Sequence, residues 1–310
     1  MPSQDWDERH EAELIHCRSV TRDLIPDVGV RTHYSLPARE GERLGIEALL
    51  VRREDPTLIV VFHGALVRRQ VTLPRFEWLR TLQERPESLL FIADTTLDVS
   101  ETLPLAWYVG TEDDNLTDRL TEKIQHVAQL VEAETVCLTG SSGGGFAALA
   151  QAARIPGSLA VPFSPQTRIG SYLPMPIKMF RKACFPSYTD YDDVEEHFRT
   201  RVDLTHLYRG QTPAWIHYSQ NVQDTDHIDA HMEPFLTSLG VDPTTGDGNP
   251  MVRVTMDDFG EDHTPPRPRQ MRSHLDAALQ WHRQQTAPPR PPEGGLKAAG
   301  RKLRLPLRGR

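Results

Sequence analysis

One segment, residues 135–149, constrains the fold of this chain more than any other. It runs from a short apolar stretch through Gly140-Ser141-Ser142-Gly143-Gly144 into an alanine-rich stretch. The apolar stretch predicts a buried strand and the alanine-rich stretch predicts a helix. Gly140 and Gly144 stand two residues either side of Ser142, and their missing Cβ atoms allow a strand and a helix to approach closely. The segment therefore predicts a tight strand-to-helix turn at residues 140–144, which we call the serine turn.

The serine turn has the G-x-S-x-G spacing that places a nucleophilic serine between a strand and a helix. Ser142 is the candidate nucleophile, because Ser141 lacks the symmetric glycine spacing. A helix N-terminus beside the serine presents free N–H groups and a positive dipole end to a developing oxyanion. Glycine-rich turns also bind phosphates, but neither G-x-x-x-x-G-K-[ST] nor G-x-G-x-x-G occurs here.

Alternating strands and helices predict a mainly parallel sheet with helices on both faces. We expect strands at 28–35, 44–52, 57–62, 88–93, 135–139, 158–163, 213–219 and 251–257, and helices at 73–82, 116–131, 143–155 and 269–282. The pattern breaks at 165–212, with weak helices around 177–183 and 192–201; this segment is either a small cap over the site or a plain surface excursion.

The length of 310 residues is enough for one large α/β domain, which we place at residues 28–285. Residues 1–27 are expected to form an N-terminal extension, and residues 286–310 a disordered basic tail. The tail carries seven basic residues and one glutamate, which gives it a net charge of +6. Since the whole chain has a net charge of −8, the rest of the chain has a net charge of −14. An acidic body argues against nucleic acid as a partner. The tail is expected to be solvated, with weak contact to an anionic membrane surface or a protein as the alternative.

The sequence also indicates the compartment. Three scattered cysteines suit neither a disulfide framework nor a zinc site. No apolar run approaches about 18 residues, and the N-terminus lacks the layout of a signal peptide. We expect a cytoplasmic protein with no cofactor and no integral membrane segment.

A serine hydroxyl needs a histidine to take its proton, and the histidine needs a carboxylate to fix its tautomer. Asp224 follows the predicted strand at 213–219 and is the preferred acid, with Asp226 as its competitor. His263 is the only histidine between the last predicted strand and the terminal helix, so it is the candidate base. The chain order is serine, acid, histidine.

Two backbone N–H groups are expected to form the oxyanion hole. One belongs to Gly143, directly after the nucleophile. The other belongs to Ala65 or Gly64, in the loop His63-Gly64-Ala65 after the third strand of the core. His63 is expected to shape this loop and to take no part in the chemistry.

His227 and His231 lie four residues apart on a predicted helix, a spacing that metalloproteases use. The glutamate that must follow the first histidine is missing, and no third ligand is evident. We interpret both as histidines on a helix surface and expect no metal.

Taken together, Phe62-His63-Gly64, the serine turn, Asp224 and His263 resemble an α/β-hydrolase across residues 28–285. The resemblance implies the α/β-hydrolase fold with a small cap insertion. More narrowly, the chain resembles bacterial, chiefly actinobacterial, hydrolases found alongside glycosyltransferases of cell-surface glycans. The strings that carry this narrower similarity are Trp107-Tyr108-Val109-Gly110, Phe163-Ser164-Pro165-Gln166-Thr167, Tyr218-Ser219-Gln220-Asn221 and Gly260-Glu261-Asp262-His263-Thr264-Pro265-Pro266. Asn221 stands where a glycine often precedes the acid, which leaves the choice between Asp224 and Asp226 open.

The predicted function is that of a serine hydrolase, an esterase that acts on an ester-like acyl bond through an acyl-enzyme. The substrate is expected to be a small molecule or a glycan ester, such as an acylated glycan or glycolipid. The same residues would serve an acyltransferase that passes the acyl group to a sugar hydroxyl. The alternative is a non-catalytic scaffold in a system that builds cell-surface glycans.

Overall fold

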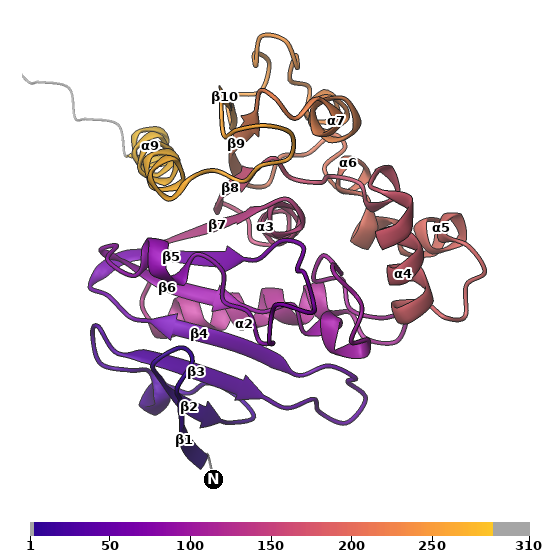
Figure 1. The fold of residues 1–310 in the computed structure, drawn as a ribbon. Coiled ribbons are helices and arrows are strands. Elements are labelled where there is room, and N and C mark those ends of the chain that lie inside the picture. The colour runs from indigo at the N-terminus through magenta and orange to yellow at the C-terminus, as the bar shows by residue number, and fades with distance from the viewer. Residues whose placement is uncertain (1–2, 288–310) are drawn as a thin grey trace, which may run out of the picture.

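The computed structural model describes residues 3–287. Within them, one sheet of ten strands has the order β1-β2-β3-β4-β6-β5-β7-β8-β9-β10 (Figure 1). The strands are β1 Ser3–Asp7, β2 Ala12–His16, β3 Arg31–Leu36, β4 Ile46–Val51, β5 Asp55–Phe62, β6 Glu87–Ile92, β7 Thr135–Ser141, β8 Leu159–Phe163, β9 Trp215–Asn221 and β10 Val252–Asp257.

The last six strands of that order are β6, β5, β7, β8, β9 and β10. Each of them pairs in parallel with its neighbours among the six. This confirms the predicted mainly parallel sheet. Strands β6 and β8 are buried along their whole length, as expected of apolar runs covered on both faces. Because the carboxyl ends of parallel strands meet at one edge, the loops after β5, β7, β8, β9 and β10 converge there.

Helices cover both faces of the sheet, as predicted. The longer helices are α2 Leu116–Leu130, α3 Gly143–Ala152, α4 Pro174–Cys184, α5 Tyr191–Val202 and α9 Pro268–Thr286; the short ones are α1 Leu79–Leu82, α6 Leu204–Leu207, α7 Thr225–His227 and α8 Glu233–Ser238, with a π-helical turn at Ile228–Met232 and 3₁₀ turns at Arg22–Leu24, Thr95–Val99 and Ile169–Ser171. One apolar core includes side chains of α2 and α3, and a second, on the opposite face, includes those of α9. Across residues 3–287, no helix combines the length and apolar character needed to cross a bilayer.

Residues 3–7 and 12–16 of the N-terminal extension predicted at 1–27 belong to the sheet. Strand β2 pairs in parallel with β3, and β1 pairs antiparallel with β2 at the sheet edge. Asp7 at the end of β1 contacts the imidazoles of His10 and His33 at 2.6 and 2.7 Å. The sheet therefore begins before residue 28, where we expected the α/β domain to start. The predicted tail is outside the described residues, apart from 286 and 287.

The helix predicted at 73–82 is wrong except for its last turn, α1 Leu79–Leu82. Pro74 has no N–H, and it biases the preceding residue away from helical angles. The guanidinium of Arg9 donates to the carbonyls of Thr72 and Pro74 at 2.7 and 2.6 Å. Because Arg9 binds these carbonyls, they do not accept helical hydrogen bonds, and residues 73–78 form a loop.

The segment at 165–212 forms three helices, α4 to α6, between β8 and β9 (Figure 1). Phe180 of α4 packs edge-on against Trp107, with ring centroids 5.3 Å apart. Tyr172, in the loop before α4, packs against the same indole at 5.9 Å. This segment therefore covers Trp107, a residue that reaches into the site described below.

At the serine turn, β7 and α3 approach as closely as the glycines suggest. A Cβ atom on Gly144 would lie 2.4 Å from the carbonyl oxygen of Phe62, and one on Gly140 would lie 2.5 Å from the backbone of Gly144. Neither position has space for a side chain, because the surrounding atoms are backbone.

Gly144→Ala should lower the free energy of unfolding by about 3 kcal/mol, since the added methyl group must displace backbone of β5. Gly143→Ala is the matched control. Its Cβ would meet only the flexible end of Leu105, so its cost should be about 1 kcal/mol. Urea unfolding of both variants measures the difference, and equal losses would contradict the close approach described here.

Candidate active site

Ser142 sits between β7 and α3 with φ 58° and ψ −119°. A non-glycine residue with positive φ costs about 1–3 kcal/mol and persists only where its surroundings hold it. The N–H of Ser142 donates to the carbonyl of Phe163 at 2.9 Å, and its carbonyl accepts from Phe146 N–H at 3.0 Å. These bonds anchor Ser142 between β8 and α3. The strained turn is the one that the G-x-S-x-G spacing predicts.

The side chain of Ser142 is held by Gln166. The amide Nε2 of Gln166 donates to Ser142 Oγ at 2.7 Å and lies 3.0 Å from Nε2 of His227. The indole N–H of Trp107 donates to Gln166 Oε1 at 3.1 Å. Because an indole nitrogen can only donate, this contact fixes which end of the buried amide is oxygen. Gln166 therefore presents its N–H groups to Ser142 and His227.

Asp224 contacts two histidines. Its Oδ2 lies 2.5 Å from Nδ1 of His263, and its Oδ1 lies 3.0 Å from Nδ1 of His227. The two imidazole rings stack, with centroids 3.7 Å apart and an angle of 9° between planes. Asp226, the alternative acid, is exposed. The geometry thus favours Asp224 over Asp226.

The charge of Asp224 is stabilised despite its burial. Burial raises the pKa of this carboxyl, but the hydrogen bonds from His227 and His263 outweigh that effect and hold the pKa well below its ordinary value. An ionised Asp224 keeps Nδ1 of each imidazole protonated, so Nε2 of a neutral His263 is free to accept a proton.

His227 and His231 do not lie on a helix surface, and that interpretation of them is wrong. Both are buried, and His227 follows Asp224 in the short helix α7. Nε2 of His227 accepts from Gln166 while its Nδ1 faces Asp224, an arrangement that suits a neutral ring. Burial lowers the pKa of His227, and it lowers the pKa of His231 to about 3. His231 contacts the backbone N–H of Thr167 at 3.3 Å.

Together these contacts join Ser142 to His263 through Gln166, His227 and Asp224. The hydrogen bonds of residues 3–287 include none directly between Ser142 and His263. The side chain of His263 is 31 % exposed, against 8 % for that of His227. Of the two histidines on Asp224, His263 is therefore the one that a substrate can reach.

The possible ligand atoms of Asp224, His227 and His263 lie within 4.8 Å of one another, and so do those of Asp7, His10 and His33. In both groups these atoms hydrogen-bond to each other. His227 and His231, whose spacing is the one that metalloproteases use, therefore do not share one group of possible ligands. His231 is outside both groups, while His227 belongs to the first.

Asn221 ties the acid loop to the histidine loop. Its amide nitrogen donates to the carbonyls of Gly260 and Asp262 at 2.8 and 2.7 Å, and its amide oxygen accepts from Phe259 N–H at 3.1 Å. A glycine at this position, which is common in the resembled family, could make none of these side-chain bonds. Asn221 therefore holds the loop that carries His263, a role that a glycine could not take.

The predicted oxyanion donors differ in availability. Gly143 is the first residue of α3, so its N–H has no acceptor within the helix. The N–H of Gly64 donates to Glu77 Oε2 at 3.1 Å, and burial raises the pKa of that carboxyl. Ala65 is exposed. The N–H of Gly64 is therefore occupied, whereas no hydrogen bond of residues 3–287 occupies the N–H of Gly143 or Ala65.

His63 shapes the loop around these donors. It is buried, and its Nε2 accepts from Asp94 N–H at 3.1 Å while its Nδ1 faces the carbonyl of Gly64 at 2.8 Å. Burial lowers the pKa of His63 to about 4. A neutral ring with both nitrogens occupied suits a structural role.

Two residues at the site, Gln166 and His227, were given no role from the sequence. A signal existed for Gln166, because it follows β8, the strand beside the serine turn, at the edge where parallel strands end. His227 lies three residues beyond Asp224, in a segment that the sequence predicts as a helix, but the predicted helix does not indicate that the ring is buried against the same carboxylate.

Asn221→Ala should lower the free energy of unfolding by about 2–4 kcal/mol, because it removes the partner of one buried and two part-buried backbone groups. Gln223→Ala is the control, since Gln223 makes one exposed side-chain contact, to Asp258. It should cost less than about 0.5 kcal/mol. Chemical denaturation measures both; a neutral Asn221→Ala would show that the histidine loop is held by other contacts.

The sequence matches no protein-family model and no curated protein. Solved structures share the fold. The capsule O-acetyltransferase of Neisseria meningitidis serogroup A superposes with a TM-score of 0.57 at 15% identity, over 79% of this chain and 92% of that one. The S-formylglutathione hydrolase of Agrobacterium tumefaciens gives 0.52 at 15%, over 82% and 94%. The fluorophosphonate-binding serine hydrolase FphF of Staphylococcus aureus gives 0.54 at 13%, over 82% and 97%.

These similarities agree with the strand order, the covered sheet and the strained turn between β7 and α3. The predicted fold is confirmed: the chain has the α/β-hydrolase fold.

Proposed function

We propose that this protein is a serine acyl-transfer enzyme in which Ser142 carries the acyl group. The observation that carries the proposal is the strained Ser142 at the end of a hydrogen-bonded chain that leads through Gln166 and His227 to Asp224 and His263. The proposal is also supported by the chain order of serine, acid and histidine. Similar folds occur in a serine hydrolase and in an O-acetyltransferase.

In the first step, Ser142 Oγ bonds to the carbonyl carbon as its proton passes to Nε2 of His263. Asp224 holds the opposite ring nitrogen and stabilises the imidazolium that forms. The bond to the leaving group then breaks, and His263 returns the proton to that group. Hydrogen bonds of this kind often tighten only when substrate is bound, which is consistent with Gln166 holding Ser142 Oγ in the free protein.

The N–H groups of Gly143 and Ala65 would stabilise the oxyanion formed in this step. In enzymes of this chemistry each such donor is worth about 3–4 kcal/mol of barrier. Gln166 is assigned a positioning role, because its N–H holds Ser142 Oγ and its oxygen is fixed by Trp107.

In the second step, water or a sugar hydroxyl takes the acyl group from Ser142. We favour an acylated glycan or glycolipid as the substrate over an unrelated small ester. This choice rests on the narrower sequence resemblance, and on the fold that the chain shares with a capsule O-acetyltransferase. The competing function is a non-catalytic scaffold in the same kind of system.

A fluorophosphonate probe should label the folded protein at Ser142, since the reagent reacts with activated serines. Ser142→Ala should remove the label, whereas Ser141→Ala, which alters the adjacent serine of the turn, should keep it. Gel fluorescence with peptide mapping measures both. If folded wild-type protein takes no label, or if Ser142→Ala labels equally, the enzyme assignment fails and the scaffold is favoured.

His263→Ala should lower the rate of p-nitrophenyl acetate hydrolysis by about a thousandfold, because it removes the base. His227→Ala should lower it by only about tenfold, because it removes one partner of Asp224 and of Gln166. Steady-state kinetics on correctly folded variants make the comparison. The reverse order of effects would make His227 the base.

A further inference from the structure

A cavity of about 640 Å³ is lined by none of the residues proposed for catalysis. It is lined by the β1–β2 turn at Arg9 and His10, by parts of residues 70–81, and by Pro265. A volume in this range suits a small-molecule ligand. No step of the reaction proposed for Ser142 involves this cavity.

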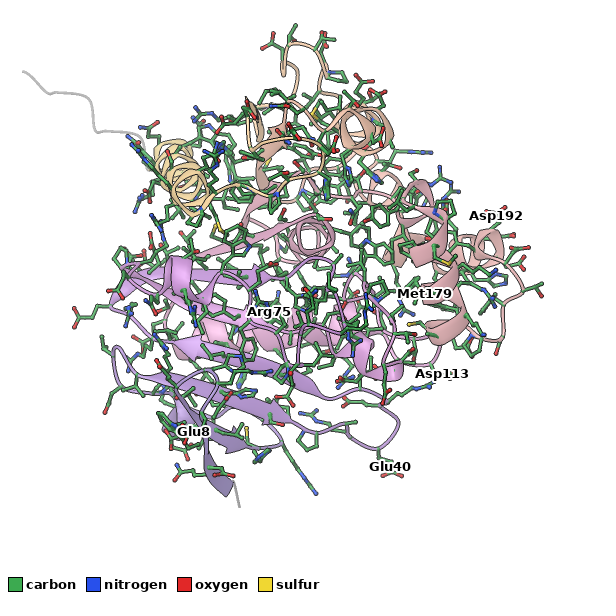
Figure 2. The ribbon with its side chains drawn as sticks, viewed as in Figure 1. Glu8, Glu40, Arg75, Asp113, Met179 and Asp192 are labelled. Carbon is green, nitrogen blue, oxygen red and sulfur yellow. The ribbon has the colours of Figure 1, made fainter. Side chains whose placement is uncertain are left out.

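The cavity is positively charged in an otherwise acidic protein. Its wall carries the guanidinium groups of Arg9, Arg75 and Arg80. Arg75, labelled in Figure 2, projects from the loop before α1. The guanidinium of Arg9 donates to two backbone carbonyls. Within residues 3–287, the side chains of Arg75 and Arg80 make no hydrogen bond and no ion pair. Glu77, the only carboxylate among the lining residues, is bound to Gly64 N–H.

Trp78 also lines the cavity. The indole nitrogen of Trp78 is buried and has no hydrogen-bond partner among the described residues. Trp78 also has φ 66°, a strained conformation of the kind that clusters at ligand sites. The guanidinium groups of Arg9, Arg75 and Arg80 donate hydrogen bonds and cannot accept them. Phosphate oxygens, which are charged acceptors and bind arginine bidentately, fit this set.

The cavity adjoins both loops of the proposed active site. Glu77 in its wall holds Gly64 N–H at 3.1 Å. A Cβ on Gly64 would in turn lie 3.5 Å from the Cβ of Ser142. Pro265 in the wall follows His263 by two residues. A ligand in the cavity therefore lies beside the loops that carry the histidine and the oxyanion donor.

We propose that this cavity binds the phosphate groups of a phosphorylated substrate that either donates or accepts the acyl group transferred at Ser142. The inference rests on the proposed function. Two substrates share this chemistry: a nucleotide thioester that donates the acyl group, and a sugar phosphate that accepts it. With a thioester, the Ser142 Oγ–carbon bond forms, the carbon–sulfur bond breaks, and the thiol leaves with the proton carried by His263.

The test compares pairs of substrates that differ only in phosphate, using the full chain. Acetyl-CoA is compared with S-acetyl-N-acetylcysteamine, which has the same thioester without phosphate. Glucose 1-phosphate is compared with methyl glucoside as acceptor. For one pair, the phosphorylated member should show a kcat/KM about tenfold to a hundredfold higher in the wild type. The pair that shows the preference identifies the source of the phosphate.

Arg75→Gln/Arg80→Gln should remove this preference and leave the rate with the unphosphorylated partner unchanged. The matched control, Arg209→Gln/Arg253→Gln, removes two exposed arginines elsewhere and should keep the preference. Calorimetry with pyrophosphate should show binding to the wild type that weakens at least about tenfold in the cavity variant only. Absence of any phosphate preference together with absence of pyrophosphate binding would overturn the proposal.

The two proposals fail in different ways. Loss of Ser142 labelling would overturn the proposed function, while calorimetry with pyrophosphate would still report on the cavity. Conversely, hydrolysis of p-nitrophenyl acetate without phosphate preference or pyrophosphate binding would leave the proposed function intact and exclude this cavity as a phosphate site.

Discussion

The close approach of β7 to α3 is the constraint on which the site depends. Backbone fills the space that a side chain at Gly140 or Gly144 would need. The chain between them must turn within a few residues, and Ser142 takes the left-handed conformation that makes this possible. The strain there is offset by the packing of two elements that are almost wholly buried. The most constrained residue of the turn is thus also the one whose hydroxyl faces the converging loops.

Parallel pairing provides the other groups. Strands β8, β9 and β10 lie beyond β7 in the sheet and end at the same edge, so Gln166, Asp224 and His263 are brought there from distant parts of the sequence. Asn221 then couples two of these loops through its amide. The buried carboxylate of Asp224 holds two stacked imidazoles. Of the two, only His263 is open enough to meet a substrate.

Much of this arrangement could be predicted from residue order. The strands before Asp224 and His263 were predicted at 213–219 and 251–257, and the glycine spacing identified the turn at Ser142. The contacts of Gln166 could not be predicted in this way, because they depend on where Trp107 places a buried donor after folding. The burial of His227 likewise depends on its contacts with Asp224 and Gln166, which a predicted helix alone does not specify.

The errors in the predicted fold have similar causes. Strands β1 and β2 have only five residues each. Contacts of Asp7 with His10 and His33 help to hold them in the sheet. The loop at 73–78 has apolar residues at helical spacing, but Pro74 and the distant Arg9 prevent the helix. In each case a long-range contact outweighed the local pattern.

The most direct test of the account is to look for the acyl group on Ser142. Wild-type protein is mixed with p-nitrophenyl acetate, quenched in acid during turnover, digested, and examined by mass spectrometry. We predict an acetyl group on the peptide that contains Ser142, bound to that residue and absent in Ser142→Ala. Ester turnover with no acetylated Ser142, or turnover that persists in Ser142→Ala, would contradict the account.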